Sequence, residues 1–439
     1  MSSHPFDVLT PDVVLDALAS VGLHGDGRLL ALSSYENRVY QAHLDEPYEG
    51  HAAVVAKFYR PGRWSEAQIL EEHGFAAELM AAEVPAVGPL VFGGATLHRY
   101  GGFQFSVSPR RGGRPPELDD VEVLEWIGRF LARIHTVGAA RPFTHRPALD
   151  VQTFLLEPRD WLAQHHMIPL DVQSAWEKRC GDALRMIEDS PLSHPVEAGI
   201  AVLRLHGDCH PGNILWTPDA GPHFVDLDDA RTGPAVQDLW MLLSGDRAQR
   251  QRQLGPLLDG YETFREFERA ELALIEPLRT LRLIHYSAWL ARRWDDPIFP
   301  ISFPWFGSSD YWQGQVQMLD EQLEAMAEPP VVAVAEDGSA VVPLLGGHRG
   351  DRDPLDEPDL QRGGPHPDDV RLLDQRQTDQ AHVVEGVEAD GDDGAIAVHD
   401  RFADNEIEQQ RRLPLDERIE GEHGWCVGID GGALLVDGL

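Results

Sequence analysis

Apolar and polar positions alternate over short stretches in the first part of the chain, and turn-forming residues separate these stretches. Such a pattern is typical of strands whose side chains point alternately to the two faces of a sheet. The first two predicted strands flank a polar turn, residues 33–37, with the sequence SSYEN. Strands are predicted at residues 28–32, 38–44, 52–59 and 103–108.

Two helices are predicted among these strands. Residues 12–21 follow Thr10, which can cap a helix, and Pro11, which suits the first helical position. Residues 65–82 form the second helix, which is expected to end before Pro85. This part of the chain therefore combines a sheet with a few helices.

Helical periodicity dominates after a link rich in glycine and proline at residues 111–116. Residues 119–137 repeat apolar side chains at i, i+3 and i+4, which predicts an amphipathic helix. A strand-rich part followed by a helix-rich part indicates an α+β fold of two lobes, residues 1–108 and 109–330, with a cleft where they meet. Further helices are predicted at residues 174–188 and 265–294.

The composition changes after Pro330. From Val331 to Leu439 the chain contains no lysine, and its 26 acidic residues outnumber 9 arginines, leaving a net charge of −17. Such a segment buries too little apolar surface to offset the entropy of the chain. We expect an acidic, disordered tail at residues 331–439; the alternative is that this stretch is not a selected coding sequence, and no function is assigned to it.

The overall charge and the cysteines exclude several classes of protein. A net charge of −36 argues against nucleic acid and anionic membranes as partners. The three cysteines form no CxxC pair, so neither a disulfide scaffold nor a zinc finger is expected. The chain opens on no secretory signal and contains no apolar stretch of about 18 residues, so we expect a cytoplasmic protein without a membrane span.

The strongest chemical signal is the sequence LHGDCHPGNILW, which begins at Leu205. Asp208 and Asn213 have the separation of the Asp and Asn in the kinase catalytic loop, H-R-D-x-x-x-x-N. An Asp in this place accepts the proton of the attacking hydroxyl, or orients that hydroxyl. Asp208 is therefore the predicted catalytic base of a phosphoryl transfer from ATP.

A Mg²⁺ site is predicted beside this loop. Asp226 directly follows an apolar strand at residues 223–225, where a kinase carries its Mg²⁺-binding Asp. Asn213 and Asp226 are the predicted ligands, because Mg²⁺ prefers oxygen atoms and takes few of them from the protein. Asp228 is the alternative to Asp226, since the carboxylates of the DLDD sequence crowd together and a divalent cation relieves their repulsion.

Lys57 lies in the predicted strand AAVVAKFY, which is similar to the V-A-I-K strand whose lysine pairs the α- and β-phosphates of ATP. Glu72, on the helix that follows, is the predicted ion-pair partner of Lys57. Glu71 and Glu78 are alternatives on the same helix, and a solvated helix carboxylate is the simplest explanation of any of the three.

Two further residues are given positioning roles. The turn at residues 33–37 occupies the place of the phosphate-covering loop but has no glycine, so the hydroxyl and backbone N–H of Ser34 are expected to contact the nucleotide there. Asp238 begins a helix after the metal-binding segment. It is expected to accept hydrogen bonds from backbone N–H groups of the catalytic loop, or to favour its own helix N-terminus by charge.

A metal-dependent hydrolase is the competing interpretation of the same segment. His206, Asp208, His210 and His223 offer imidazole and carboxylate groups that Zn²⁺ would accept. That interpretation leaves Lys57 and the two-lobe order unexplained.

With these residues placed, the chain from about residue 5 to 330 resembles a group of bacterial serine/threonine protein kinases. That group belongs to the aminoglycoside phosphotransferase and choline kinase-like branch of the kinase fold. The resemblance rests on long matching segments, and the tail after residue 330 lies outside it. These segments are SYENRVYQ (34–41), KFYRPGRWS (57–65), QILEEH (68–73), LHGDCHPGNILW (205–216), FVDLDDARTGPAVQDLWMLL (224–243), ARRWDDPIFPISFPWFGSSDYW (291–312) and EPP (328–330).

The resemblance implies Asp208 as proton acceptor, Asn213 and Asp226 on Mg²⁺, and Ser34 at the ATP site. It also implies a cytoplasmic, monomeric kinase that acts in survival under oxidative or envelope stress. In this family a phosphate-covering loop without glycine is usual. The expected activity is the ATP- and Mg²⁺-dependent phosphorylation of Ser and Thr in proteins, the kinase itself included. A small alcohol as the acceptor, and an ATP-binding adaptor without activity, are the alternatives.

Overall fold

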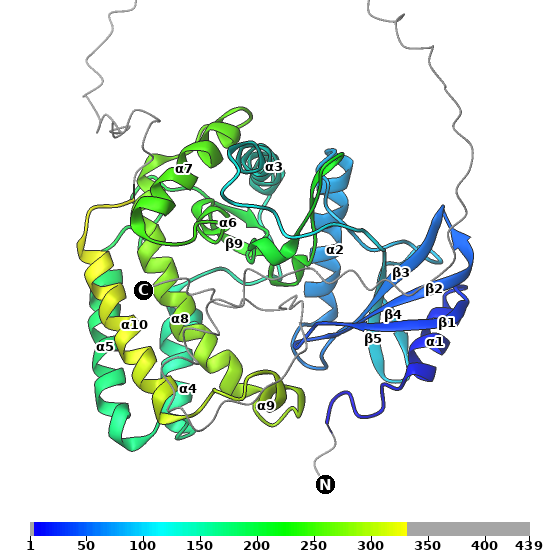
Figure 1. The fold of residues 1–439 in the computed structure, drawn as a ribbon, viewed down its shortest axis with the longest axis horizontal. Coiled ribbons are helices and arrows are strands. Elements are labelled where there is room, and N and C mark those ends of the chain that lie inside the picture. The colour runs from blue at the N-terminus through cyan, green and yellow to red at the C-terminus, as the bar shows by residue number, and fades with distance from the viewer. Residues whose placement is uncertain (1–3, 332–439) are drawn as a thin grey trace, which may run out of the picture. The chain divides into compact units, whose positions relative to one another are not determined.

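The first lobe is built on a five-stranded antiparallel sheet in the order β1-β2-β3-β5-β4 (Figure 1). The computed structural model describes residues 4–331 of the chain, so the predicted tail lies outside the described residues except for Val331. That residue is buried in the core of the second lobe. The strands are β1 (Gly25–Leu32), β2 (Arg38–Tyr48), β3 (His51–Phe58), β4 (His98–Tyr100) and β5 (Phe103–Pro109).

Strand β3 shows how the alternating sequence separates the two faces of this sheet. Val54, Ala56 and Phe58 are fully buried in the core of the first lobe. Lys57 and its neighbours at i−2 and i−4, Val55 and Ala53, must then share the opposite face, because side chains alternate along a strand. The predicted strand is therefore confirmed, and its single lysine lies on the face away from the core.

Helix α1 (Pro11–Ser20) and helix α2 (Glu66–Ala81) begin where the sequence predicts them. The side chain of Thr10 accepts a hydrogen bond from the backbone N–H of Val13. Ser65 and Gln68 form a reciprocal capping box at the start of α2. Local side-chain chemistry therefore determines where both helices start.

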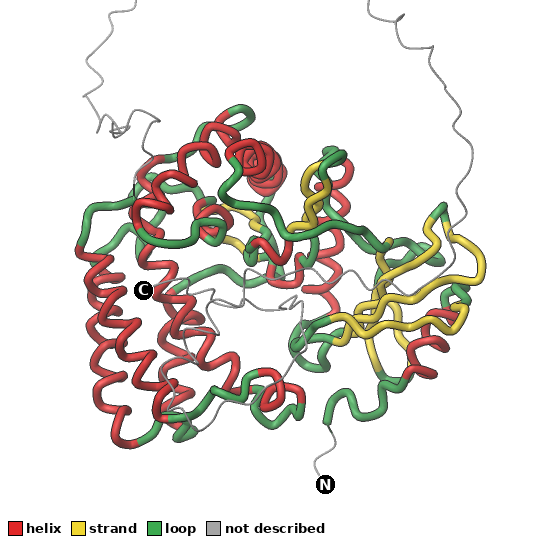
Figure 2. The backbone as a smooth tube through the Cα atoms, in the orientation of Figure 1, coloured by secondary structure: helices red, strands yellow, loops and turns green. Residues whose placement is uncertain are grey.

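The second lobe is mostly helical (Figure 2). Helices α5, α8 and α10 pack against one another, and α3 packs against α7. A side chain at Gly128 of α3 or at Gly260 of α7 would collide with the backbone of the other helix, so these glycines permit the close approach. The helices are α3 (Val121–Ala139), α4 (Glu157–Gln164), α5 (Leu170–Glu188), α6 (Val236–Trp240), α7 (Arg247–Glu262), α8 (Ile275–Arg292), α9 (Ile298–Ser302) and α10 (Ser309–Ala327).

Two short strand pairs hold the chemistry-bearing segment between these helices. Strand β6 (Val202–Leu205) pairs with β9 (Arg231–Pro234), and β7 (Ile214–Thr217) pairs with β8 (Gly221–Phe224). Backbone hydrogen bonds also join β8 to the first lobe: Phe224 N–H donates to Pro85 O at 2.8 Å, and Val87 N–H donates to Phe224 O at 2.9 Å. The two lobes therefore meet at Phe224, two residues before Asp226. Among the described residues, no helix combines the length and apolar character needed to cross a bilayer.

Candidate active site

Asp208 lies in the loop that follows β6, and its side chain is only 5 % exposed. Its Oδ1 accepts a hydrogen bond from Nη2 of Arg282 on α8 at 2.8 Å. Nδ2 of Asn213 donates to the backbone oxygen of Asp208 at 2.9 Å and lies 3.4 Å from its Oδ2. The two residues that the sequence pairs by spacing are therefore in contact, and Arg282 is a neighbour that the local sequence does not indicate.

Asp238 holds the start of this loop. Its carboxylate accepts hydrogen bonds from the backbone N–H groups of His206 at 2.9 Å and Gly207 at 2.8 Å, and His135 Nε2 lies 3.0 Å away. Burial by itself would raise the pKa of Asp238, but the hydrogen bond and charge of His135 outweigh it and lower the pKa. The predicted hydrogen bonds to the catalytic loop are confirmed, and His135 is an additional partner that the sequence did not indicate.

We expect Asp238→Asn to lower the free energy of unfolding by about 1–3 kcal/mol, because one buried donor loses its acceptor when a carboxylate oxygen becomes an amide group. Urea titration of the full chain measures this change. The exposed Asp259→Asn is the matched control and should leave the stability unchanged. Equal stability of the two variants would show that Asp238 does not anchor the loop.

A second buried carboxylate holds the helix that carries Asp238. Glu271 accepts a hydrogen bond from the backbone N–H of Val236 at 2.8 Å, at the start of α6. Burial raises the pKa of Glu271 to about 7, from an ordinary value of 4.5. Because the folded protein disfavours the charged form, Glu271 lowers the stability progressively as the pH rises from its unfolded pKa to its folded pKa.

The variant Glu271→Gln should therefore gain stability relative to the original chain as the pH rises from 5 to 8, by up to about 3 kcal/mol. The amide oxygen of glutamine can still accept the hydrogen bond from Val236. Unfolding midpoints of both proteins across this pH range test the prediction. A stability difference that stays constant with pH would contradict it.

Asp226 and Lys57 connect the two lobes at the end of β8. Asp226 has a left-handed backbone, with φ 59° and ψ 65°, which is uncommon for a residue with a side chain and occurs often at functional sites. Nζ of Lys57 donates to Oδ1 of Asp226 at 2.7 Å and lies 3.3 Å from Oδ1 of Asp228. The ammonium group of the first lobe thus lies beside two carboxylates of the second.

Asn213 and Asp226 stay the predicted ligands of Mg²⁺, and the oxygen atoms of both side chains are of the kind that this ion accepts. Nδ2 of Asn213 faces Asp208, so the amide oxygen of Asn213 points away from Asp208. Within the described part of the chain, this oxygen accepts no hydrogen bond. The Asp226 side chain is 19 % exposed, whereas that of Asp228 is 3 % exposed and lies 2.7 Å from Arg63. One amide and one carboxylate oxygen leave coordination positions for phosphate and water, as is usual for Mg²⁺. Asp226 therefore suits the ion better than Asp228.

Glu72, on α2, is buried close to the same charges. The pKa of Glu72 is raised to about 7: burial raises it most, and the charge of Asp228 adds to this, while the nearby Lys57 lowers it. Its Oε2 lies 3.7 Å from Nη1 of Arg146. An ion pair of Glu72 with Lys57 stays a prediction. Glu71 is engaged elsewhere, because its carboxylate accepts backbone hydrogen bonds from residues 144–146.

The turn at residues 33–37 is attached to the second lobe. The Ser34 hydroxyl donates to Asn37 O at 3.1 Å, within the turn itself. Glu36 is fully buried, accepts a hydrogen bond from Nε1 of Trp289 on α8 at 2.8 Å and lies 2.5 Å from Nε of Arg293, the residue that follows this helix. Burial would raise the pKa of Glu36, but nearby arginines outweigh it and lower the pKa. Contact of Ser34 with a nucleotide stays a prediction.

Two arginines between β3 and α2 complete a charged cluster that the sequence did not indicate. Nε of Arg60 lies 3.1 Å from the Glu36 carboxylate, and Nη1 of Arg63 lies 3.6 Å from it. Arg63 also contacts Asp229 at 3.0 Å, and neighbouring arginines keep the pKa of Asp229 low despite its burial. The resemblance segments SYENRVYQ and KFYRPGRWS contain Glu36, Arg60 and Arg63. Assigning charge partners to those segments could have found the cluster.

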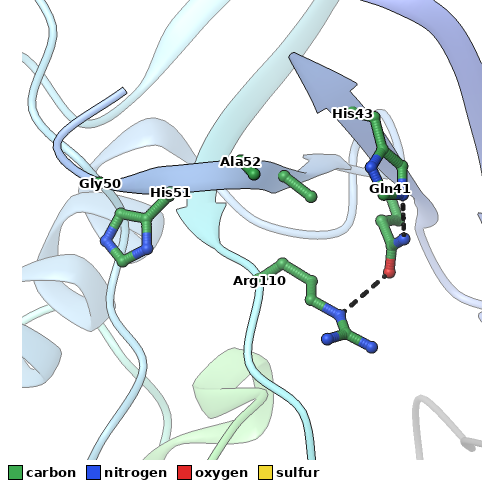
Figure 3. Close-up of a pocket in the computed structure, with 7 residues that line it drawn as sticks. Gln41, His43, Gly50, His51, Ala52 and Arg110 are labelled. Atoms are coloured by element: carbon green, nitrogen blue, oxygen red, sulfur yellow. Dashed lines mark hydrogen bonds between the residues drawn. The ribbon is translucent and has the colours of Figure 1, made fainter. Parts of the chain in front are cut away.

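A cavity of about 470 Å³ is lined by residues of strands β2 and β3 and by Arg110 (Figure 3). Gln41 and His43 line it, and the cross-strand partner of His43 is Ala53, which shares a face with Lys57. Nε of Arg110 donates to Oε1 of Gln41 at 3.3 Å, at the edge of the same cavity. Ala53 lies about 13 Å before Lys57 along the strand. The cavity therefore adjoins the sheet face that carries Lys57, at a distance from the charged groups.

Two of the histidines on which the Zn²⁺ hydrolase interpretation depends have other partners in the structure. Within the described residues, no group of three or more His, Cys, Asp or Glu side chains is placed to hold a metal ion. Nε2 of His206 lies 2.9 Å from the backbone oxygen of Val225, and Nδ1 of His210 accepts the Gly212 N–H at 3.0 Å. Both histidines thus shape the loop.

The site can be compared with known proteins. A sequence profile described as "Phosphotransferase enzyme family" matches residues 28–275. Stress response kinase A of Escherichia coli (strain K12) is 47% identical over 330 residues, which cover 75% of this chain and 97% of that protein. A Salmonella typhimurium relative, called serine/threonine protein kinase RdoA, is 47% identical over 326 residues, or 74% of this chain and 96% of the relative.

Solved structures agree on the fold. The chain is similar to an amicoumacin kinase, with a TM-score of 0.55 and 18% identity over 73% of this chain and 94% of that one. It is also similar to a microcompartment-associated aminopropanol kinase, with a TM-score of 0.52 and 18% identity over 72% of this chain and 97% of the other. The predicted α+β, kinase-like fold is therefore confirmed. The chain belongs to the phosphotransferase enzyme family, within which it groups with the stress response kinases.

Proposed function

We propose that the chain is an ATP- and Mg²⁺-dependent serine/threonine protein kinase that also phosphorylates itself and acts in the cytoplasm in a bacterial stress response. The observation that carries this proposal is the meeting of Lys57 and Asp226 beside the contacting pair Asp208 and Asn213. Val225 N–H donates to Asn213 O at 3.0 Å, so the two parts of the site are joined by the backbone. The names of the 47%-identical relatives support the protein acceptor and the stress response.

Each residue has a defined task in this reaction. Asp208 orients the acceptor hydroxyl and takes its proton as the oxygen attacks the γ-phosphate. Lys57 supplies a positive charge to the phosphates, after its present ion pair with Asp226 has opened. Asn213 and Asp226 would hold Mg²⁺, which when bound neutralises phosphate charge and aligns the phosphates.

The test is to incubate the full chain with ATP and Mg²⁺ and to measure intact and peptide masses. Added phosphate groups on Ser or Thr, absent when Mg²⁺ is chelated, are expected. Nucleotide binding without any phosphate transfer to protein would contradict the proposed acceptor. In that case a panel of small alcohols distinguishes a small-molecule kinase from an adaptor without activity.

A further inference from the structure

Arg282 forms an ion pair with the predicted catalytic base. Nη2 of Arg282 donates to Oδ1 of Asp208 at 2.8 Å, and their side chains are 14 % and 5 % exposed. Within the described part of the chain, Asp208 is the only ion-pair or hydrogen-bond partner of the Arg282 guanidinium. A guanidinium group has five N–H donors, so most of its donors remain available beside the carboxylate.

Arg231, which also lies near Asp208, has other partners. The stem of Arg231 packs close to Gly207, but its guanidinium contacts the Asp229 side chain at 2.7 Å and the Asp229 backbone oxygen at 2.9 Å. On the far side of Asp208, Oδ2 lies 3.6 Å from His210 Nε2 and 3.4 Å from Asn213 Nδ2. Arg282 thus places a permanent positive charge beside the Asp208 carboxylate, and its guanidinium has N–H donors that are not used by other described residues.

An acceptor hydroxyl must reach hydrogen-bond distance of an Asp208 oxygen, which places the groups around it within a few ångströms of Arg282. At that separation in a partly dry site, a positive group on the acceptor is repelled and a carboxylate is attracted. A guanidinium also binds a carboxylate through two parallel hydrogen bonds, which favours a planar anion over a diffuse charge.

We propose that Arg282 selects the acceptor: it binds a carboxylate next to the phosphorylated hydroxyl and rejects cationic alcohols. The preferred substrate is then a Ser or Thr with an acidic neighbour in a protein. Acceptors such as aminoalcohols are excluded by charge. This inference rests on the proposed kinase function and names the substrate class for the same site.

The test uses the full chain with saturating ATP and Mg²⁺ and measures kcat/KM for peptides that carry one serine flanked by glutamate, glutamine or lysine, and for choline. The original protein should prefer the glutamate peptide to the lysine peptide by at least about tenfold. Arg282→Gln should abolish this ratio, chiefly by raising KM for the glutamate peptide, and should increase phosphorylation of the lysine peptide. Arg282→Lys keeps the charge and should keep the order of the peptides.

Arg279→Gln is the matched control, because Arg279 lies one turn earlier on α8 and contacts Glu276 at 3.9 Å. It should retain the original ratio. A merely structural role of Arg282 would lower the rates for all peptides alike, and an unchanged ratio in Arg282→Gln would overturn the inference by itself. A preference of the original protein for choline or the lysine peptide would also overturn it. Failure of the original protein to phosphorylate any acceptor would overturn the proposed function together with the inference, and is visible without any variant.

Discussion

The variant Asp208→Asn is expected to transfer phosphate about 10²–10⁴-fold more slowly than the original chain, because an amide cannot take the proton of the acceptor hydroxyl. The backbone should not change, since the Asp208 backbone oxygen still accepts the hydrogen bond from Asn213. Nucleotide binding should also persist, because Lys57 and Asp226 are not altered. The effect should therefore appear in kcat and leave the affinity for ATP nearly unchanged.

Single-turnover phosphorylation with excess enzyme measures the chemical step directly. Asp219→Asn is the matched control, since Asp219 is exposed in the turn between β7 and β8. It removes the same charge within the same segment and should retain the full rate. If Asp208→Asn kept a rate close to that of the control, Asp208 would not be the base.

The second large effect is expected at the metal site. Asp226→Asn should raise the Mg²⁺ concentration for half-maximal activity by at least about 10–100-fold, the range seen when even an outer partner of a metal ligand is lost. The reason is that Asp226 is the negatively charged member of the predicted ligand pair, whereas Asn213 is neutral. The variant also weakens the contact of Lys57 at 2.7 Å by removing the charge of its partner, while Asp228 stays 3.3 Å away, so weaker nucleotide binding at low Mg²⁺ is not expected.

Asp228→Asn separates the two carboxylates experimentally. Asp228 is almost fully buried, and its Oδ2 accepts a hydrogen bond from Asn37 at 3.2 Å and lies 2.7 Å from Arg63. Its loss should mainly lower the free energy of unfolding, because charged partners are left buried without their counterpart. Mg²⁺ titrations and unfolding curves of both variants give the answer. A larger Mg²⁺ shift in Asp228→Asn than in Asp226→Asn would exchange the two roles.

Features set by neighbouring residues were predictable from the sequence. The cap at Thr10 and the alternation along β3 depend on residues a few positions apart, and both predictions are confirmed. The capping box at Ser65 has the same local origin, although the sequence pattern predicts this residue inside the helix. Strand β4 has only three residues, which is too short to show alternation. Helix α7 contains Pro256 and lacks a clear apolar face, and neither signal favours a helix.

The site divides in the same way. Asp208 and Asn213 are five residues apart on one loop, so their contact follows from spacing alone. The contact between Asp208 and Arg282 spans 74 residues, and that between Glu36 and Trp289 spans 253. Such contacts arise from the packing of α8 against both lobes, which no local pattern contains. The sequence predicted the role of a charged residue only where that residue lies close to a recognised motif.

The attachment of the 33–37 turn also bears on the kinetics of the enzyme. A glycine-rich loop can swing away from the phosphates while the rest of the protein stays still, whereas this turn is bonded through Glu36 to Trp289 and Arg293. If the nucleotide lies under this turn, as the sequence predicts, its release would require the sheet and the helical lobe to separate, because the turn is bonded to both. In that case the opening of the lobes would limit turnover. A more viscous solvent would then slow the enzyme more than a nucleotide with a poorer leaving group would.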